Sequence, residues 1–97
     1  MLTQEVKKYI NSSVLCWLAT SSKENISNVS PKEVFTYFGE EAIIIANIAS
    51  PQTVKNIKEN SNVCISFIDV LVQKGLQIKG SAEVVKKGNQ IIAFALE

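Results

Sequence analysis

The stretch with the clearest chemical potential runs from residue 42 to residue 60, AIIIANIASPQTVKNIKEN. Its first half is a short, β-branched apolar run, which predicts a strand. Ser50 and Pro51 then predict a helix start, because serine caps a backbone N–H and proline fits the first helical position. A strand that leads into a capped helix directs N–H groups at one spot, where Thr53 and Lys55 add a hydroxyl and a cation. This pattern suits a phosphate, although most capped helices bind no anion.

Histidine is absent from the 97 residues, and the two cysteines, Cys16 and Cys64, lie apart in apolar runs. The missing histidine excludes serine–histidine and cysteine–histidine nucleophile systems and the usual zinc sites. The cysteine spacing favours two small buried side chains over metal ligands or a disulfide. If the protein is an enzyme, a bound cofactor must therefore supply the difficult chemical step.

The composition is that of one globular domain covering residues 1–97, with 46% hydrophobic residues, 20% charged residues and a formal net charge of +1. A chain of this length buries only about 60–68% of its unfolded surface, so help from a partner subunit is plausible. The near-neutral charge argues against a nucleic-acid partner. No apolar run approaches the ~18 residues of a membrane span, and the N-terminus lacks the hydrophobic region of a signal peptide. We therefore expect a cytoplasmic protein without a membrane partner.

Hydrophobic periodicity predicts a helix over residues 3–11 and then four strands. The first strand, residues 14–21, is apolar on both alternations, so we expect a barrel interior behind it and a helix or a second subunit in front. A turn at residues 23–25 predicts a hairpin with the second strand, which Pro31 interrupts at an edge or bulge. The third strand, residues 33–38, and the fourth, residues 42–48, complete an expected antiparallel meander of strands two to four.

After the helix that begins at Pro51, alternation predicts strands over residues 63–69 and 76–85, with a loop at residues 71–75. Residues 90–97 suit either a further strand or a helix, and we favour the helix. Strands joined by short turns with one helical excursion indicate an antiparallel barrel rather than a parallel βαβ sheet. The expected fold is mainly β (α+β): a six-stranded antiparallel barrel with a short N-terminal helix and one helix after the fourth strand.

Four stretches, taken in order, resemble a known family: LCWLATSS (15–22), NVSPKEVF (28–35), IIIANIASPQTVKNIKEN (43–60) and VCISFIDVLVQKGLQIKGSAEVV (63–85). Their order and spacing over about residues 13–85 are similar to the pyridoxamine 5'-phosphate oxidase-related, FMN-binding split β-barrel family. The resemblance implies a homodimer that packs barrel to barrel, with FMN in clefts at the interface.

The resemblance also implies a set of cofactor-binding residues. The isoalloxazine ring would meet Ser30, Pro31 and Lys32. The ribityl-phosphate end would be lined by Asn47, Ala49, Ser50, Thr53, Lys55 and Asn56, and Gln73 and Lys74 would reach in from the partner. Family members often carry a basic residue where this chain has Gln52, so the phosphate charge would rest mainly on Lys55 and the helix dipole.

A flavin would bring its own electron sink, which explains how a redox protein can lack histidine. Lys32 is the candidate cation beside the reduced ring, and a solvent-facing strand lysine is the alternative. Trp17 and Phe35 could flank the ring, but aromatic residues in apolar strands are more often core.

Three functions stay open at this point. The first is an FMN-dependent oxidoreductase between a nicotinamide nucleotide and a small acceptor. The second is a flavin-binding or sensing module without turnover. The third is an interaction module, or a barrel that uses another ligand such as a deazaflavin or haem.

Overall fold

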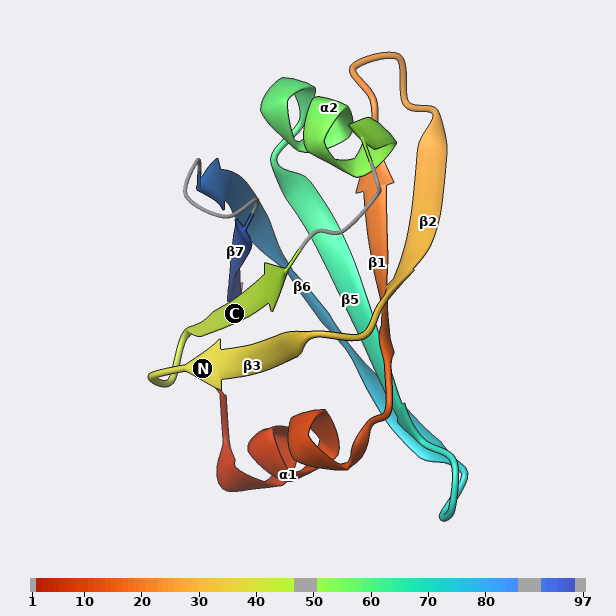
Figure 1. Cartoon of the computed structure of the whole chain (residues 1–97), viewed down its shortest axis with the longest axis vertical. Coiled ribbons are helices and arrows are strands. Elements are labelled where there is room, and N and C mark those ends of the chain that lie inside the picture. The colour runs from red at the N-terminus through yellow and green to blue at the C-terminus, as the bar shows by residue number, and fades with distance from the viewer. Residues whose placement is uncertain (1, 47–50, 86–89, 96–97) are drawn as a thin grey trace.

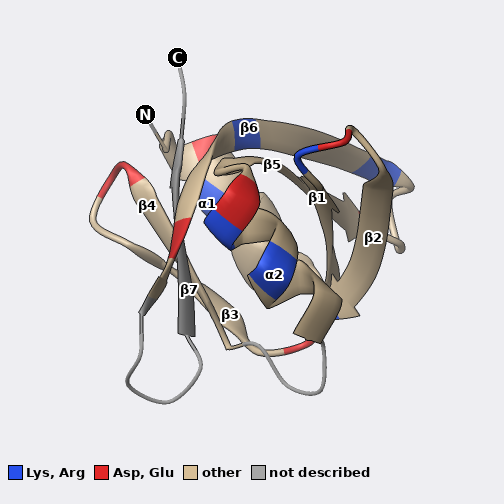
Figure 2. Cartoon of the chain, turned by 90° about the horizontal axis from the view of Figure 1, so that it is seen from above, with Lys and Arg blue, Asp and Glu red and all other residues tan. Residues whose placement is uncertain are grey.

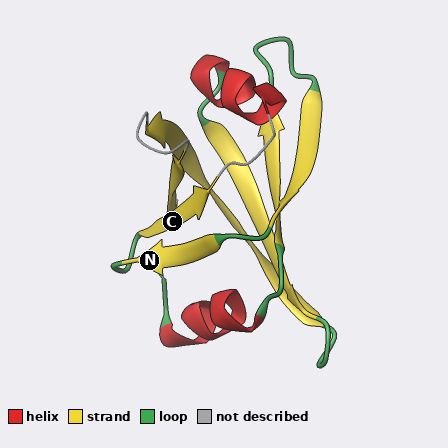
Figure 3. Cartoon of the chain, viewed as in Figure 1, coloured by secondary structure: helices red, strands yellow, loops and turns green. Residues whose placement is uncertain are grey.

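The computed structural model describes residues 2–46, 51–85 and 90–95. Figures 1 and 3 show the order of the elements in this part of the chain: α1 (Gln4–Ser12), β1 (Cys16–Ser21), β2 (Ser27–Lys32), β3 (Phe35–Phe38), β4 (Ala42–Ala46), α2 (Pro51–Glu59), β5 (Asn62–Asp69), β6 (Lys74–Val85) and β7 (Gln90–Ala95). Neither described helix is long and apolar enough to cross a membrane.

The strands form one antiparallel sheet in the order β2-β1-β5-β6-β7-β4-β3. The sheet curls, and the view from above in Figure 2 shows the strands arranged around α2. Because β2 and β3 are the two edges, the barrel is open between them, and only residues 33–34 link the two strands. The prediction of a mainly β split barrel with two helices in these places is confirmed.

Both helices begin where the local sequence predicts. Thr3 caps α1, because its Oγ1 accepts a hydrogen bond from the backbone N–H of Val6 at 3.2 Å. α2 begins at Pro51, in the first helical position that suits proline. Each helix buries an isoleucine, Ile10 in α1 and Ile57 in α2, so each is fixed to the barrel by an apolar contact.

The core lies inside the curled sheet. Its largest fully buried apolar side chains come from β1, β4 and β5: Leu18, Ile43, Ile45, Ile65 and Phe67. The ring of Phe35 packs edge-on against that of Phe67 with the centroids 5.4 Å apart. Phe35 is therefore a core-packing residue, as the ordinary reading of an aromatic in an apolar strand predicts.

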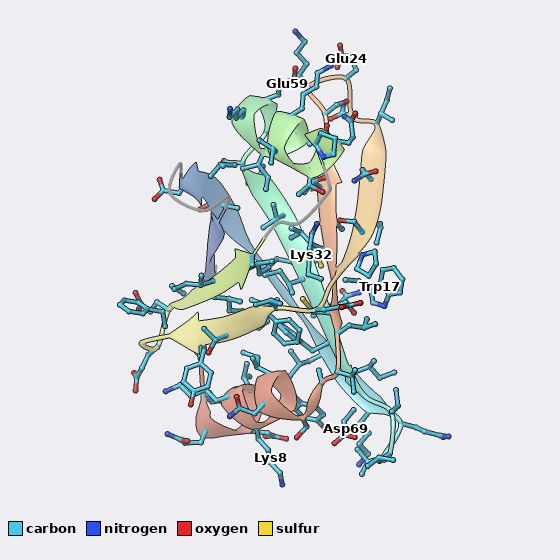
Figure 4. The ribbon with its side chains drawn as sticks, in the orientation of Figure 1. Lys8, Trp17, Glu24, Lys32, Glu59 and Asp69 are labelled. Carbon is cyan, nitrogen blue, oxygen red and sulfur yellow. The ribbon has the colours of Figure 1, made fainter. Side chains whose placement is uncertain are left out.

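The outer face of β1 differs from the prediction. Trp17 is 43% exposed, and Figure 4 shows no described helix packed over it, so the expected cover by a helix is wrong. Cover by a second subunit stays a prediction. In the residue pairing of β1 with its two neighbours, Trp17 lies opposite Pro31 on β2 and Ser66 on β5, at the centre of this uncovered face.

Two strand pairings also correct the sequence-based expectation. The expected meander of strands two to four is wrong, because β2 pairs with β1 and β3 pairs with β4, while β2 and β3 lie at opposite ends of the sheet. Strand β2 also continues through Pro31 to Lys32. An edge strand tolerates this proline because one of its sides has no neighbouring ladder.

The C-terminal residues 90–95 form strand β7, so the preferred helix is wrong and the described sheet has seven strands rather than six. β7 lies between β6 and β4, and Ala93 pairs with Ala82 on one side and with Ile43 on the other. Two adjacent ladders outweigh a weak local preference for helix. The loop expected at residues 71–75 is also shorter, because β6 begins at Lys74.

Candidate functional site

A row of polar residues lines the inner side of the edge strand β2. In the antiparallel pairing with β1, Lys32 lies opposite Cys16, Ser30 opposite Leu18, and Asn28 opposite Thr20. Directly paired residues project from the same face of a sheet, and the three β1 residues are buried. We call Asn28, Ser30 and Lys32 the polar row. Polar side chains inside a barrel are costly unless they have partners or hold a ligand.

Helix α2 meets the polar row with polar side chains of its own. Thr53 is 0% exposed and Asn56 is 1% exposed. The hydroxyl oxygens of Ser30 and Thr53 lie 3.2 Å apart and share a hydrogen bond. The Nδ2 of Asn56 donates to the Oγ1 of Thr20 at 3.1 Å, and its Oδ1 accepts from the Nε2 of Gln52 at 2.8 Å. This polar seam between α2 and the strands β1 and β2 therefore fixes the helix at the barrel mouth.

Lys32 ends the polar row in the interior. Its side chain is only 3% exposed, and Figure 4 shows it between α2 and β3, whereas Trp17 projects from the opposite side of β1. The alternative of a solvent-facing lysine is therefore wrong. Burial lowers the pKa of Lys32, and the nearby Cys16 thiol acts in the opposite direction. Burial also raises the pKa of Cys16 to about 12, so this thiol stays protonated at neutral pH.

A hollow lies at each end of the polar row. A cleft of about 550 Å³ separates the β1–β2 loop from α2 and is lined by Asn28, by Lys23 and Glu24 of the loop, and by Lys55 and Glu59 of the helix, among others. A smaller hollow of about 230 Å³ is lined by Pro31, Lys32, Glu33, Val34 and Ala46. The four residue steps from Asn28 to Lys32 correspond to roughly 13 Å of strand.

The wall of the larger cleft is a constrained loop. The Oγ of Ser22 accepts from the backbone N–H groups of Glu24 at 3.2 Å and Ile26 at 3.1 Å. The backbone N–H of Lys23 donates to the Oε1 of Glu59 at 3.5 Å, which ties the loop to α2. Figure 2 shows both basic and acidic positions on this loop and on α2. The cleft therefore presents two lysines whose charge nearby glutamates partly offset.

The structure divides the predicted site residues into groups. It brings Ser30, Thr53 and Asn56 together at the seam and places Lys32 on the same face of β2. Lys55 is exposed and lines the larger cleft, on another face of α2 from the buried Thr53. Pro31 is exposed and lines the smaller hollow. Asn47, Ala49 and Ser50 lie outside the described residues.

Gln73 and Lys74 do not reach the seam within one chain. Both are exposed at the β5–β6 hairpin, where Gln73 takes the left-handed conformation with φ 56°. Figure 1 shows this hairpin projecting at the opposite end of the barrel from α2. Their predicted contribution to a site therefore depends on a partner, as the family resemblance implies.

Sequence reasoning missed Thr20, which belongs to the seam, and Asn28, which lies opposite Thr20 in the polar row and lines the larger cleft. The signal was present, because polar residues recur at every second position of β2, from Asn28 through Ser30 to Lys32. This alternation predicts one polar face, but the sequence does not say whether that face is inside or outside.

Residues 2–94 match a protein-family model described as pyridoxamine 5'-phosphate oxidase. No curated protein sequence matches the chain. Among solved structures the chain is similar to HupZ of Group A Streptococcus, crystallised as a point variant, with 25% identity, a TM-score of 0.85 and coverage of 100% of this chain and 96% of that one. It is also similar to a candidate pyridoxamine 5'-phosphate oxidase from Lactobacillus delbrueckii, with 21% identity and a TM-score of 0.82. The match covers 99% of this chain and 90% of that one.

Three further structures share the fold and differ in the cofactors that their names give. An FMN-binding protein from Syntrophomonas wolfei is 14% identical, with a TM-score of 0.74 and coverage of 94% of this chain and 80% of that one. An F420 reductase is 18% identical, with a TM-score of 0.72 and coverage of 92% of this chain and 90% of that one. The haem storage protein HutZ of Vibrio cholerae is 18% identical, with a TM-score of 0.70 and coverage of 100% and 92%.

Proposed function

The chain belongs to the pyridoxamine 5'-phosphate oxidase family, and from this premise we propose that it binds FMN along β2. The observation that carries the proposal is the polar row, which runs inside the barrel between two hollows and ends at a buried lysine. A mononucleotide with a ring at one end and a phosphate at the other suits a strand-length site with a hollow at each end. The family supports a flavin or a related cofactor in this place.

The residues of this chain would divide the cofactor between them. Ser30, Pro31 and Lys32 would hold the ring beside the smaller hollow. Thr53, Lys55 and Asn56, with Asn47, Ala49 and Ser50 before the helix, would hold the ribityl-phosphate end near α2. FMN, when bound, accepts and returns a hydride or single electrons. The positive charge of Lys32 would stabilise negative charge on the ring, and it acts strongly because its surroundings exclude water.

We also propose that two copies form the working unit. The outer face that β1 leaves uncovered carries Trp17, and Val29 and Ile68 on the neighbouring strands are exposed as well. The β5–β6 hairpin exposes further apolar side chains, including Leu71 at 91%. A second barrel would cover such surfaces, and it would bring Gln73 and Lys74 of one copy to the cofactor of the other.

The proposed reaction is the transfer of a hydride or electrons between a nicotinamide nucleotide and a small acceptor in the cytoplasm. A flavin-binding or sensing module without turnover is the second candidate, since it uses the same seam. A deazaflavin would also suit the seam. Haem fits this seam less well, because the chain lacks histidine, and Cys16, the cysteine opposite the polar row, is fully buried with its pKa raised to about 12.

An absorption spectrum of the purified protein titrated with FMN, combined with its size in solution, tests this proposal. We expect a dimer that binds one FMN per chain and whose visible flavin band bleaches with a reduced nicotinamide nucleotide. Binding without bleaching would favour the sensing module. An absence of FMN binding at millimolar concentration would reject the flavin proposal.

A pair of variants tests the place of the phosphate. Lys55→Ala should weaken FMN binding by roughly tenfold or more, because it removes a charge-assisted contact. Lys58→Ala is the matched control, since Lys58 is an exposed lysine of the same helix that does not line the cleft. Equal affinities of the two variants would move the phosphate away from this cleft.

A further inference from the structure

We propose that the larger cleft accepts a ligand with one terminal phosphate and discriminates against a ligand with a further phosphate, and that Glu24 and Glu59 set this preference. The inference rests on the proposed function for the direction of the ligand, whose phosphate end lies near α2. It adds the selection of a mononucleotide, FMN, over a dinucleotide such as FAD. The size of the cleft, the charges at its outer end and the hydrogen bonds of its loop carry the inference.

The size of the larger cleft does not limit the ligand to one phosphate. Its volume of about 550 Å³ lies within the range of about 300–1,000 Å³ that is common for drug-sized ligands. A phosphate group alone is much smaller than this space. Discrimination against a longer ligand must therefore come from the charges and the hydrogen-bond donors of the cleft.

On the helix side, Glu59 lies beyond the residues proposed for the phosphate. Gln52, Lys55, Asn56 and Glu59 all line the cleft, and their spacing of three or four residues places them on one face of α2. Glu59 follows Lys55 by about one helical turn, which is about 5.4 Å along the axis. A ligand group that extends past Lys55 along this face therefore meets a carboxylate.

The opposite wall of the cleft presents a second carboxylate at the same end. This wall runs from Asn28 of the polar row to Glu24 and Lys23 of the β1–β2 loop. The backbone N–H of Lys23 donates to the Oε1 of Glu59 at 3.5 Å, so the two walls meet at the end away from Asn28. Figure 4 shows Glu24 and Glu59 at this same end of the molecule. A second phosphate there would lie beside two carboxylates and one lysine, so repulsion exceeds attraction.

The loop directs its backbone N–H groups to acceptors within the protein. Those of Glu24 and Ile26 donate to the Oγ of Ser22 at 3.2 Å and 3.1 Å. That of Asn25 donates to the carbonyl oxygen of Ser22 at 3.0 Å, and that of Lys23 donates to the last residue of α2. Loops that hold a pyrophosphate direct successive N–H groups at it. Because these four N–H groups already have acceptors, this loop does not provide such a cradle.

Titration calorimetry of the full chain with FMN and with FAD tests the inference. We expect FMN to bind about three- to tenfold more tightly than FAD, and Glu24→Gln/Glu59→Gln to bring this ratio close to one, because exposed charges have modest effects. A glutamine at position 59 keeps an oxygen that can accept from the N–H of Lys23. Glu40→Gln/Glu83→Gln is the matched control, since both glutamates are exposed and lie outside the cleft lining. An equal affinity for the two flavins in the unchanged chain, or an unchanged ratio in Glu24→Gln/Glu59→Gln, would overturn the inference.

Inorganic anions separate this inference from the proposed function. Phosphate and pyrophosphate probe the cleft without a flavin, through the amide chemical shifts of residues 23–26 and of Lys55. We expect pyrophosphate to bind the unchanged chain no more tightly than phosphate does, and to gain affinity in Glu24→Gln/Glu59→Gln. This result without flavin binding would reject the FMN proposal alone. Flavin binding with tighter binding of pyrophosphate than of phosphate to the unchanged chain would reject the inference alone, and binding of neither anion nor flavin would reject both.

Discussion

Replacement of Asn56 tests whether the polar seam holds α2 on the barrel. The Asn56→Leu variant keeps approximately the same volume but removes the amide that donates to Thr20 at 3.1 Å. Thr20 is buried, so its hydroxyl loses this partner in a site that water does not reach. Removal of one partner of a buried hydrogen bond leaves the other polar group unsatisfied, which costs about 1–3 kcal/mol. We therefore expect the free energy of unfolding to fall by about 1–3 kcal/mol.

The matched control is Gln52→Ala, which removes the other hydrogen bond of Asn56. Gln52 is exposed and donates to Asn56 at 2.8 Å from one helical turn away. Such a pair on a helix surface contributes only about 0.2–0.5 kcal/mol, because water replaces it. Both variants are measured by urea unfolding, followed by circular dichroism and by the fluorescence of Trp17, the single tryptophan.

The double variant Thr20→Val with Asn56→Leu completes the test. It replaces both buried partners with apolar side chains of similar shape, so no polar group is left alone. We expect most of the lost stability to return, with a coupling energy of about 1–3 kcal/mol between the two positions. For a chain of this size, the Asn56→Leu variant should melt roughly 5–25 °C lower, and the double variant should recover most of this loss. Additive costs, or a loss no greater than that of Gln52→Ala, would refute the role of the seam.

Three further predictions follow from burial and exposure. Between pH 9.0 and about 12 the unfolded chain releases the Cys16 proton while the folded chain keeps it, so the free energy of unfolding should fall as pH rises. Cys16→Val should flatten this pH dependence, and the control Cys64→Val should not. As pH rises toward 10.5, the folded chain should release the Lys32 proton before the unfolded chain does, so this group should make the free energy of unfolding rise with pH; Lys32→Met should remove this rise, and an unchanged pH dependence would contradict the account of its burial. Trp17→Glu should leave the fold intact but weaken the proposed dimer at least 100-fold by sedimentation, and an unaltered dimer would place the interface elsewhere.

Local features of the fold could be predicted because they depend on neighbouring residues. Thr3 and Pro51 mark helix starts through capping and through the fixed φ of proline, and both helices begin there. The β1–β2 and β3–β4 hairpins follow from two alternating runs joined by a turn. Ser30, Lys32, Thr53 and Asn56 were placed in one expected site by the family resemblance and not by such short-range rules.

The arrangement of distant strands could not be predicted in this way. Strand β2 lies beside β1 and far from β3 in the sheet order, although only two residues connect β2 to β3. Residues 90–95 became a strand because β6 and β4 leave a position between them, and hydrogen bonds to both neighbours outweigh the local preference. Sequence alternation carries no information about which strand occupies that position.

The sequence by itself determined which residues of this protein are polar, cationic or able to start a helix, and with the family resemblance it determined the class of fold. Only the tertiary structure decided that the polar face of β2 lies inside the barrel, that Lys32 is buried opposite Cys16, and that Lys55 lines the larger cleft while Thr53 is buried at the seam. The physical reason is that alternation along a strand fixes which residues share a face, whereas the direction of that face depends on how the sheet curls and on what packs against it.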